Sequence, residues 1–325
     1  MNARLVSVGN VVIDIAARVP NLPERGGDVL AEAAGVSAGG SFNTMVAAVR
    51  QGLPTAYAGA HGTGVFGDRV RAELLAAGID VLLPPTPGLD TGYDIVLIDA
   101  GGERTFVTVF GAEAALTATA VSAVLPGEHD LVHVSGYGLL ERTNGAVLSA
   151  WLGTVPAGTR VLFDPGPLAT DIPDEVWRRV TGRADWLSCN AREAMMLTGE
   201  TDAVAALRAG CSTRGGWPLR PSQSGHLPRV GGVEGGVVVR LGPDGCLLCV
   251  RGEITHVPGF PVAAVDTTGA GDAHAGAFLA ALAAGEHPVA AARRANACAA
   301  LAVTRSGPAT APTRAEVDAL LGAGR

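Results

Sequence analysis

The strongest constraint on the fold of this chain is a regular alternation of short apolar runs, rich in β-branched residues, with longer runs rich in Ala and Leu. The first kind predicts buried strands and the second predicts helices. Gly52, Gly78 and Gly285 each follow a helical run, where glycine ends a helix at low cost. Strands separated by helices predict an α/β fold with a mostly parallel central sheet covered on both faces. The expected strands include Leu5–Val8, Val132–Val134, Val161–Phe163, Trp186–Ser188 and Val237–Leu241, and the expected helices include Thr44–Gln51, Arg69–Ala77, Ala273–Ala284 and Val289–Val303.

Three segments interrupt this alternation. Residues 11–36 and 91–111 are rich in strand-forming residues, and the second contains Ala-Gly-Gly-Glu at 100–103, a signal for a hairpin turn. Together they predict a small β-sheet lid beside the main body. Residues 208–232 hold six Gly, three Pro and four Arg without an acidic residue, which predicts an irregular, solvated insertion. We expect a single domain over residues 1–325.

The composition excludes several kinds of enzyme. All 24 Lys and Arg residues are Arg, so the lysine of a Walker-A phosphate loop, of a protein kinase or of a Schiff base is absent. A net charge of −7 without a basic stripe argues against nucleic acid or an anionic membrane as a main partner. No apolar run is long enough to span a membrane, and Asp14 interrupts the apolar stretch near the N-terminus. These features predict a cytoplasmic protein.

The cysteines and histidines give no metal or disulfide signature. Five cysteines are scattered over the chain, and Cys246 and Cys249 lie in the run Cys-Leu-Leu-Cys-Val, which is typical of a buried strand rather than of a metal or redox site. The seven histidines lack the spacing of metal ligands.

The most specific motif is Asp-Thr-Thr-Gly-Ala-Gly-Asp at residues 266–272, which runs into a predicted helix. The residues Gly269, Ala270 and Gly271 have almost no side chain, so their N–H groups can approach an anion at the positive end of the helix. Asp272 in the first turn could simply favour the helix dipole. Beside a phosphate site, its carboxylate instead suits a general base that accepts the proton of an attacking hydroxyl.

Two further motifs combine small or polar residues at the start of a predicted helix. Gly39 and Gly40 permit close approach to a ligand, and Asn43 either binds hydroxyls or only caps the helix. Asn190 and Glu193 follow a predicted strand and form either a capping box or a polar pair near metal and phosphates. Asp14 is a further polar residue in an apolar context.

In order and spacing, these motifs resemble the PfkB/ribokinase family of sugar and nucleoside kinases. Similar segments, including residues 59–67, 102–106 and 239–245, extend the resemblance over nearly the whole chain. The resemblance implies a three-layer α/β/α sandwich with a β lid, and transfer of the γ-phosphoryl group of ATP to a primary hydroxyl of a small sugar, sugar acid or nucleoside. It also implies Mg²⁺ as cofactor and a possible homodimer formed through the lid.

The resemblance assigns roles to individual residues. Asp272 would be the general base, and Gly269, Ala270 and Gly271 the anion hole. The substrate hydroxyls would be bound by Asp14, Gly39, Gly40 and Asn43. Asn190 and Glu193 would act near Mg-ATP, and Arg240, Gly242, Gly245 and Asn296 would line the nucleotide. A possible monovalent cation such as K⁺ would be bound by the Asp266 side chain and by backbone carbonyls around Thr268, Ala302, Arg305 and Gly307.

Two differences from ribokinase itself bear on the substrate. Val12 stands where ribokinase has Asn, and Gly136 stands where it has Glu. Both differences argue against ribose as the substrate.

Two other functions are compatible with parts of the sequence. Gly62, Gly64 and Gly67 match the Gly-x-Gly-x-x-Gly pattern of dinucleotide-binding loops, which would indicate an NAD(P)-dependent oxidoreductase. The same fold could also belong to a non-catalytic regulator that binds a sugar or a nucleotide.

Overall fold

The structure, a computed structural model, describes residues 3–211 and 235–323. Its main sheet has nine strands in the order β13-β12-β11-β10-β9-β8-β1-β4-β5. The seven strands from β11 to β5 are parallel, and β12 and β13 are antiparallel additions at one edge. The predicted mostly parallel sheet is therefore confirmed. The strands are β1 (Leu5–Ser7), β4 (Thr55–Tyr57), β5 (Asp80–Val81), β8 (Leu131–Ser135), β9 (Arg160–Asp164), β10 (Trp186–Asn190), β11 (Gly236–Arg240), β12 (Cys246–Val250) and β13 (Glu253–Val257).

Alternate residues of the parallel strands enter two separate apolar cores. Val161 and Phe163 of β9 pack into the core on one face, whereas Leu162 between them packs into the core on the other. Successive side chains of a strand point to opposite faces, so a strand covered on both sides must be apolar at every position. This is why the buried strands of this chain are continuous apolar runs.

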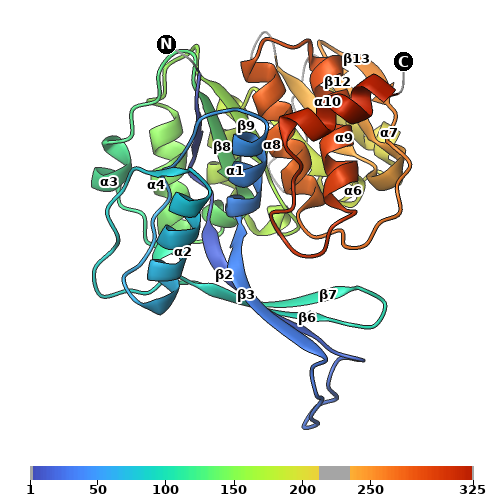
Figure 1. Ribbon diagram of the computed structural model, residues 1–325. Coiled ribbons are helices and arrows are strands. Elements are labelled where there is room, and N and C mark those ends of the chain that lie inside the picture. The colour runs from blue at the N-terminus through green and yellow to red at the C-terminus, as the bar shows by residue number, and fades with distance from the viewer. Residues whose placement is uncertain (1–2, 212–234, 324–325) are drawn as a thin grey trace.

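Helices cover both faces of the sheet and complete the three layers (Figure 1). The first core includes residues of α3 (Ala118–Ser122), α4 (Arg142–Leu152), α5 (Asp174–Arg183), α6 (Ala191–Thr198) and α7 (Ala203–Cys211). The second core includes residues of α1 (Ser41–Arg50), α8 (Ala270–Ala283), α9 (Pro288–Ala302) and α10 (Arg314–Ala323). The helix α2 (Val65–Ala76) packs with α1 in a third cluster.

The glycines expected to end helices do so. Gly52, Gly78 and Gly285 have φ values of 88°, 73° and 80°, which lie in the left-handed region that favours glycine. By contrast, α7 continues to Cys211, four residues into the segment expected to be irregular. The apolar residues Ala206 and Leu207 hold it against the first core. Residues 212–232 of that expected insertion lie outside the described residues.

A separate four-stranded sheet projects from one end of the main body (Figure 1). It has the order β3-β2-β6-β7, and only the pair β2 and β6 is parallel. The turn at residues 100–103 joins β6 and β7 as the hairpin signal predicted. Its strands are β2 (Val11–Arg18), β3 (Ala33–Gly40), β6 (Tyr93–Ile98) and β7 (Arg104–Val109), so β3 extends four residues beyond the expected end at residue 36.

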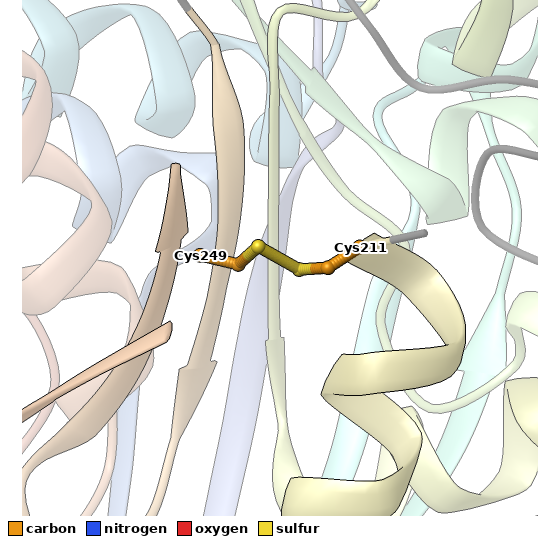
Figure 2. Close-up of a disulfide and its surroundings, with 2 residues drawn as sticks. All are labelled: Cys211 and Cys249. Carbon is orange, nitrogen blue, oxygen red and sulfur yellow. A yellow bond between two sulfur atoms is a disulfide. The ribbon is translucent and has the colours of Figure 1, made fainter. Parts of the chain in front are cut away.

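One disulfide joins the end of α7 to the main sheet. Cys211 pairs with Cys249 of β12, and their Cα atoms are 6.3 Å apart (Figure 2). The strand expected at residues 246–250 is confirmed, but the pairing of Cys249 was not predicted, because cysteine spacing alone does not say which thiols meet. Cys246 is free and buried. Among the described residues, no helix is both long and apolar enough to cross a membrane.

Candidate active site

Polar side chains gather at the carboxyl ends of the parallel strands, where ligands bind in open α/β sheets. Ser135 at the end of β8 is paired in register with Asp164 at the end of β9, and Asn190 of β10 is paired with Arg240 of β11. A cavity of about 280 Å³ opens between these strand ends, the start of α8 and the small sheet. The residues that line it include Asn10, Val12, Asp14, Gly40, Ser41, Asn43, Asp94, Phe106, Thr108, Phe110, His133, Ser135, Tyr137, Asp164, Glu193, Arg240, Thr268, Gly269, Gly271 and Asp272.

The start of α8 forms one wall of the cavity. Gly269 precedes the helix with φ 71° and ψ 10°, a left-handed conformation that turns the chain into the first helical residue, Ala270. The first amides of a helix have no partner inside the helix, and the dipole makes this end positive. Gly269 and Gly271 both line the cavity, so these amides lie where an anion can reach them.

Asp272 follows directly and is held by α1. Its Oδ1 accepts a hydrogen bond of 2.7 Å from the Thr44 hydroxyl. This contact requires α1 and α8 to pack closely, and Gly276 permits it, since a Cβ at Gly276 would lie 2.3 Å from the Thr44 carbonyl oxygen. Burial, with a further contribution from Asp164, raises the pKa of Asp272 to about 6, against the opposing effect of the Thr44 hydrogen bond and Arg240. A carboxylate with such a pKa can accept a proton near neutral pH.

Asn43 lies beside Asp272 rather than at the end of a helix. The N-cap of α1 is Gly40, and Asn43 is the third residue of the helix, so the capping interpretation is wrong. Its side chain is buried, lines the cavity and favours the charged form of Asp272. Its Oδ1 is buried without a hydrogen-bond partner in the described part of the chain. A buried acceptor of this kind is available to a ligand hydroxyl.

Asp14 is placed against the glycine pair of β3. A Cβ at Gly39 would lie 2.2 Å from Asp14 Oδ2, so glycine is required for the carboxylate to fit. At Gly40, φ is 61° and a Cβ would lie 2.6 Å from the Asn10 carbonyl oxygen. Burial, followed by repulsion from Asp94 and Asp272, raises the pKa of Asp14 to about 7.

A second carboxylate of the small sheet was missed by sequence reasoning. Asp94 of β6 is paired in register with Asp14 of β2, and Thr108 of β7 is paired with Asp94. All three side chains line the cavity. Burial raises the pKa of Asp94, and its Oδ1 has no hydrogen-bond partner among the described residues. Polar residues at alternate positions of predicted strands were the available signal.

Arg240 is the one arginine among the described residues that line the cavity. Its Nη1 donates to Asp164 Oδ2 at 3.0 Å and to the Ser188 hydroxyl at 2.6 Å. Its Nη2 lies 3.8 Å from Glu193 Oε2, and its guanidinium lies 3.4 Å from the position of a Cβ at Gly271. The guanidinium therefore faces the amides at the start of α8 as well as two carboxylates. Sequence analysis did not single out Asp164, although it directly follows the predicted strand 161–163. It is the last residue of β9, as Asn190 is the last residue of β10.

Asn190 and Glu193 form the capping box that was one of their two interpretations. The Asn190 side chain accepts from the Glu193 amide at 2.8 Å, and the Glu193 carboxylate accepts from the Asn190 amide at 2.8 Å. Glu193 also lines the cavity, and burial together with Asp164 raises its pKa. Capping thus fixes the direction in which this carboxylate points.

Three residues expected to line the nucleotide lie outside this cavity. Gly242 begins a short turn after β11 and Gly245 directly follows it, with φ values of 64° and 91°. Asn296 of α9 is buried, and its amide donates to the carbonyls of Val257 and Pro258 at 2.9 and 3.1 Å. It holds the chain after β13 in place.

The residues expected to bind a monovalent cation are close together. Asp266 accepts from the Thr268 amide and hydroxyl at 2.9 and 2.6 Å and from the Gly307 amide at 3.0 Å. Arg104 of the small sheet forms an ion pair with the same carboxylate. Burial alone would raise the pKa of Asp266, but these hydrogen bonds and Arg104 lower it below its ordinary value. The carbonyl oxygen of Ala302 accepts from the Arg305 amide at 3.1 Å.

The glycines of the dinucleotide pattern do not form a phosphate loop. The Asp90 carboxylate accepts from the amides of Phe66 and Gly67 at the start of α2, at 3.2 and 2.7 Å. A Cβ at Gly62 would lie 2.4 Å from backbone atoms of residues 89 and 90, and a Cβ at Gly67 would lie 2.0 Å from the Gly62 carbonyl oxygen. The helix end is thus occupied by the protein's own carboxylate, and the oxidoreductase hypothesis is not supported.

Comparison with known proteins decides the family. A family model described as pfkB family carbohydrate kinase matches residues 2–314. The chain belongs to this family. This PfkB kinase is 32% identical to an uncharacterized sugar kinase of Escherichia coli K12, YegV, over 95% of its own length and 91% of that protein. It is 30% identical to the ATP-dependent ribose-1-phosphate kinase of Halopiger xanaduensis, with 98% of each chain covered.

A solved structure gives the same result. Ribokinase of Arabidopsis thaliana, complexed with ribose and ATP, superimposes on the kinase with a TM-score of 0.73 at 26% identity, covering 99% of each chain. The ribokinase-like fold is thereby confirmed, and the chain is an ATP-dependent sugar kinase rather than a non-catalytic regulator.

Proposed function

We propose that this kinase transfers the γ-phosphoryl group of ATP to a primary hydroxyl of a small, uncharged polyhydroxyl acceptor, a sugar or a nucleoside. The observation that carries the proposal is the position of Asp272. It lies at the start of α8 beside the glycine turn, is hydrogen-bonded to Thr44, and shares the cavity with Asp14 and Asn43.

Asp272 acts as the general base. It accepts the proton of the acceptor hydroxyl while that oxygen forms a bond to the γ-phosphorus, and the bond from this phosphorus to the β–γ bridging oxygen breaks to release ADP. The amides of Gly269, Ala270 and Gly271 stabilise the charge on the transferring group. Arg240 adds a positive charge next to this turn, since its guanidinium lies 3.4 Å from the position that a Cβ at Gly271 would take.

The same region fits a magnesium ion held together with ATP. Mg²⁺ uses one or two carboxylates plus substrate phosphates, and when bound it neutralises phosphate charge. Asp164 and Glu193 supply carboxylates that line the cavity near Arg240. Asn190 orients Glu193 through the capping box.

The charges of the cavity select the kind of acceptor. Five carboxylates and one guanidinium line it, and the guanidinium is paired with Asp164. The acceptor side carries Asp14 and Asp94, and Arg240 is the only arginine that lines the cavity in the described part of the chain. Once both carboxyls are ionised, an anionic acceptor, such as a sugar acid or a sugar phosphate, would meet two like charges there, whereas hydroxyls can donate to both carboxylates and to Asn43.

Two further residues disfavour ribose in particular. Gly136 stands where ribokinase has Glu, and a Cβ there would lie 1.9 Å from the Pro165 carbonyl oxygen, so no side chain fits. Val12 brings a buried apolar surface to the cavity where ribokinase has Asn. Both changes remove hydrogen-bond partners for ribose.

The small sheet serves as a lid that excludes water from the transfer. Phe106 and Phe110 bring aromatic side chains to the cavity, and both are about half exposed without an acceptor. Closure over a bound acceptor buries them and limits hydrolysis of ATP.

The outer face of the lid supports a homodimer. Val36, Ile15, Ile95 and Val107 form one apolar row across the four strands, in register, and three of them are exposed. An apolar row of this kind on a projecting sheet suits a second copy of the same sheet. Replacing Val107 by Glu should yield a monomer in analytical ultracentrifugation, and an unchanged mass would contradict the proposed dimer.

An ADP-release assay with three groups of acceptors tests the proposal. The groups are neutral sugars and nucleosides, sugar acids, and sugar phosphates, each run with the wild type and with Asp272→Asn. We expect the wild type to release ADP with at least one neutral acceptor, and ³¹P NMR to show a phosphate on a primary hydroxyl of the product. The variant should give neither result. Turnover restricted to anionic acceptors would overturn the proposed acceptor class.

A further inference from the structure

An arginine of the lid reaches the turn that leads into the anion hole. Arg104 is the first residue of β7, and its guanidinium forms an ion pair with Asp266. Its Nη1 also lies 3.4 Å from the Thr267 hydroxyl. The side chains of Arg104 and Asp266 are only 18% and 11% exposed, so the contact is largely shielded from water. A charge pair of this kind is stronger than one on the open surface.

Asp266 connects Arg104 to the backbone next to Gly269. Both of its oxygens accept backbone amides, Oδ1 from Thr268 and Oδ2 from Gly307. The Thr268 hydroxyl donates to Oδ1 as well. The carboxylate therefore fixes the turn that directly precedes α8. Without Arg104, the negative charge of Asp266 would be largely buried without a positive partner, which would destabilise the turn.

The residues implied for a monovalent cation do not fit one in this arrangement. Asp266 Oδ1 already accepts from Arg104 and from both donors of Thr268, and a cation at that carboxylate would face the guanidinium. The Ala302 carbonyl accepts from the Arg305 amide and from the Thr310 hydroxyl, each at 3.1 Å. The ligand set is thus occupied by donors of the protein itself.

We propose that Arg104 is a positioning residue that supplies, from the lid, the positive charge beside the anion hole, so that this kinase works without a bound monovalent cation. Because the charge comes from β7, the hold on the anion-hole turn depends on the position of the small sheet. The inference rests on the kinase activity proposed above.

Cation dependence of two variants tests the inference. Wild type, Arg104→Ala and Arg104→Lys are assayed with saturating acceptor in potassium or tetramethylammonium salts at constant ionic strength. Arg18→Ala is the matched control. Arg18 and Arg104 are both paired in register with Ile98, so they lie in one cross-strand row, but Arg18 is exposed.

We expect kcat of the wild type and of Arg18→Ala to change less than about twofold between the two salts. In tetramethylammonium, Arg104→Ala should lose about 10- to 100-fold in kcat, the scale of a misplaced catalytic geometry. Potassium or millimolar guanidinium should restore part of this loss. Arg104→Lys should keep its charge and remain insensitive to potassium.

A second measurement does not need turnover. Potassium should raise the melting temperature of Arg104→Ala but not that of the wild type. Only in the variant does the Asp266 carboxylate lack a positively charged partner that potassium can replace. Activation or thermal stabilisation of the wild type by potassium, or wild-type kcat of Arg104→Ala in tetramethylammonium, would overturn the inference. If no acceptor supports turnover, the proposed function fails, and the melting temperatures still decide the role of Arg104.

Discussion

The corner where α1 meets α8 and the inner face of the small sheet both carry aspartates into one cavity, but they hold them differently. Asp272 is fixed by a hydroxyl from a neighbouring helix, and the close helix packing depends on Gly276. Asp14 and Asp94 stand side by side on neighbouring strands, and Asp94 keeps a buried oxygen without a partner among the described residues. Asp272 thus has a hydrogen-bond partner within the protein, whereas Asp94 leaves an acceptor open to a ligand, as Asn43 does beside Asp272. The proposed division of roles rests on this difference: the corner performs the chemistry, and the small sheet chooses the acceptor.

Replacing Asp272 by Asn should break the corner and give the largest effect. The amide has nearly the same shape but cannot accept a proton, so kcat should fall by about 100-fold or more, the range of general base catalysis. ATP should still bind, as isothermal titration calorimetry can check. An Asn variant with wild-type kcat would show that another group takes the proton.

Replacing Asp14 by Asn should affect the small sheet only. The acceptor loses a carboxylate that its hydroxyls can donate to, so KM for the acceptor should rise about tenfold or more while the Kd of ATP stays unchanged. Glu24→Gln is a control that removes an exposed carboxylate from the loop between β2 and β3. A fall in kcat without a change in KM would mean that Asp14 belongs to the chemistry instead.

The pH dependence should separate the two regions further. Burial raises the pKa of Asp272 to about 6, and its charged form is the active one, so kcat/KM should fall about tenfold per pH unit below that value. Asp14 has a higher pKa, about 7, but both of its forms can bind hydroxyls. A profile that stays flat from pH 8 to pH 5 would contradict the role of Asp272.

The two regions also differ in how far the sequence predicts them. The motif at residues 266–272 is contiguous, so its position at a helix start follows from local signals, and the parallel sheet follows from the alternation of runs. The capping box of Asn190 was likewise anticipated. Local patterns decided each of these features.

The remainder depends on contacts between distant parts of the chain. Thr44 reaches Asp272 across 228 positions, and Arg104 reaches Asp266 across 162. The pairing of Asp14 with Asp94 depends on a strand register that no local pattern gives. The match of Gly62 to a nucleotide loop failed for the same reason, because Asp90, 28 positions away, turns back to the helix start at which an anion would bind.

The most direct test of the division between corner and small sheet is the ratio of kcat/KM for a matched pair of acceptors. The pair consists of a neutral sugar found in the ADP-release assay and the corresponding sugar acid. At pH 8, above the raised pKa of Asp14, the wild type should favour the neutral acceptor by about 100-fold or more, because like charges at the acceptor side cost several kcal/mol. Replacing Asp14 and Asp94 together by Asn should reduce this ratio while Asp272 continues to act as the base. A wild type that phosphorylates the acid as well as the neutral sugar, or a ratio that the double variant leaves unchanged, would contradict the account.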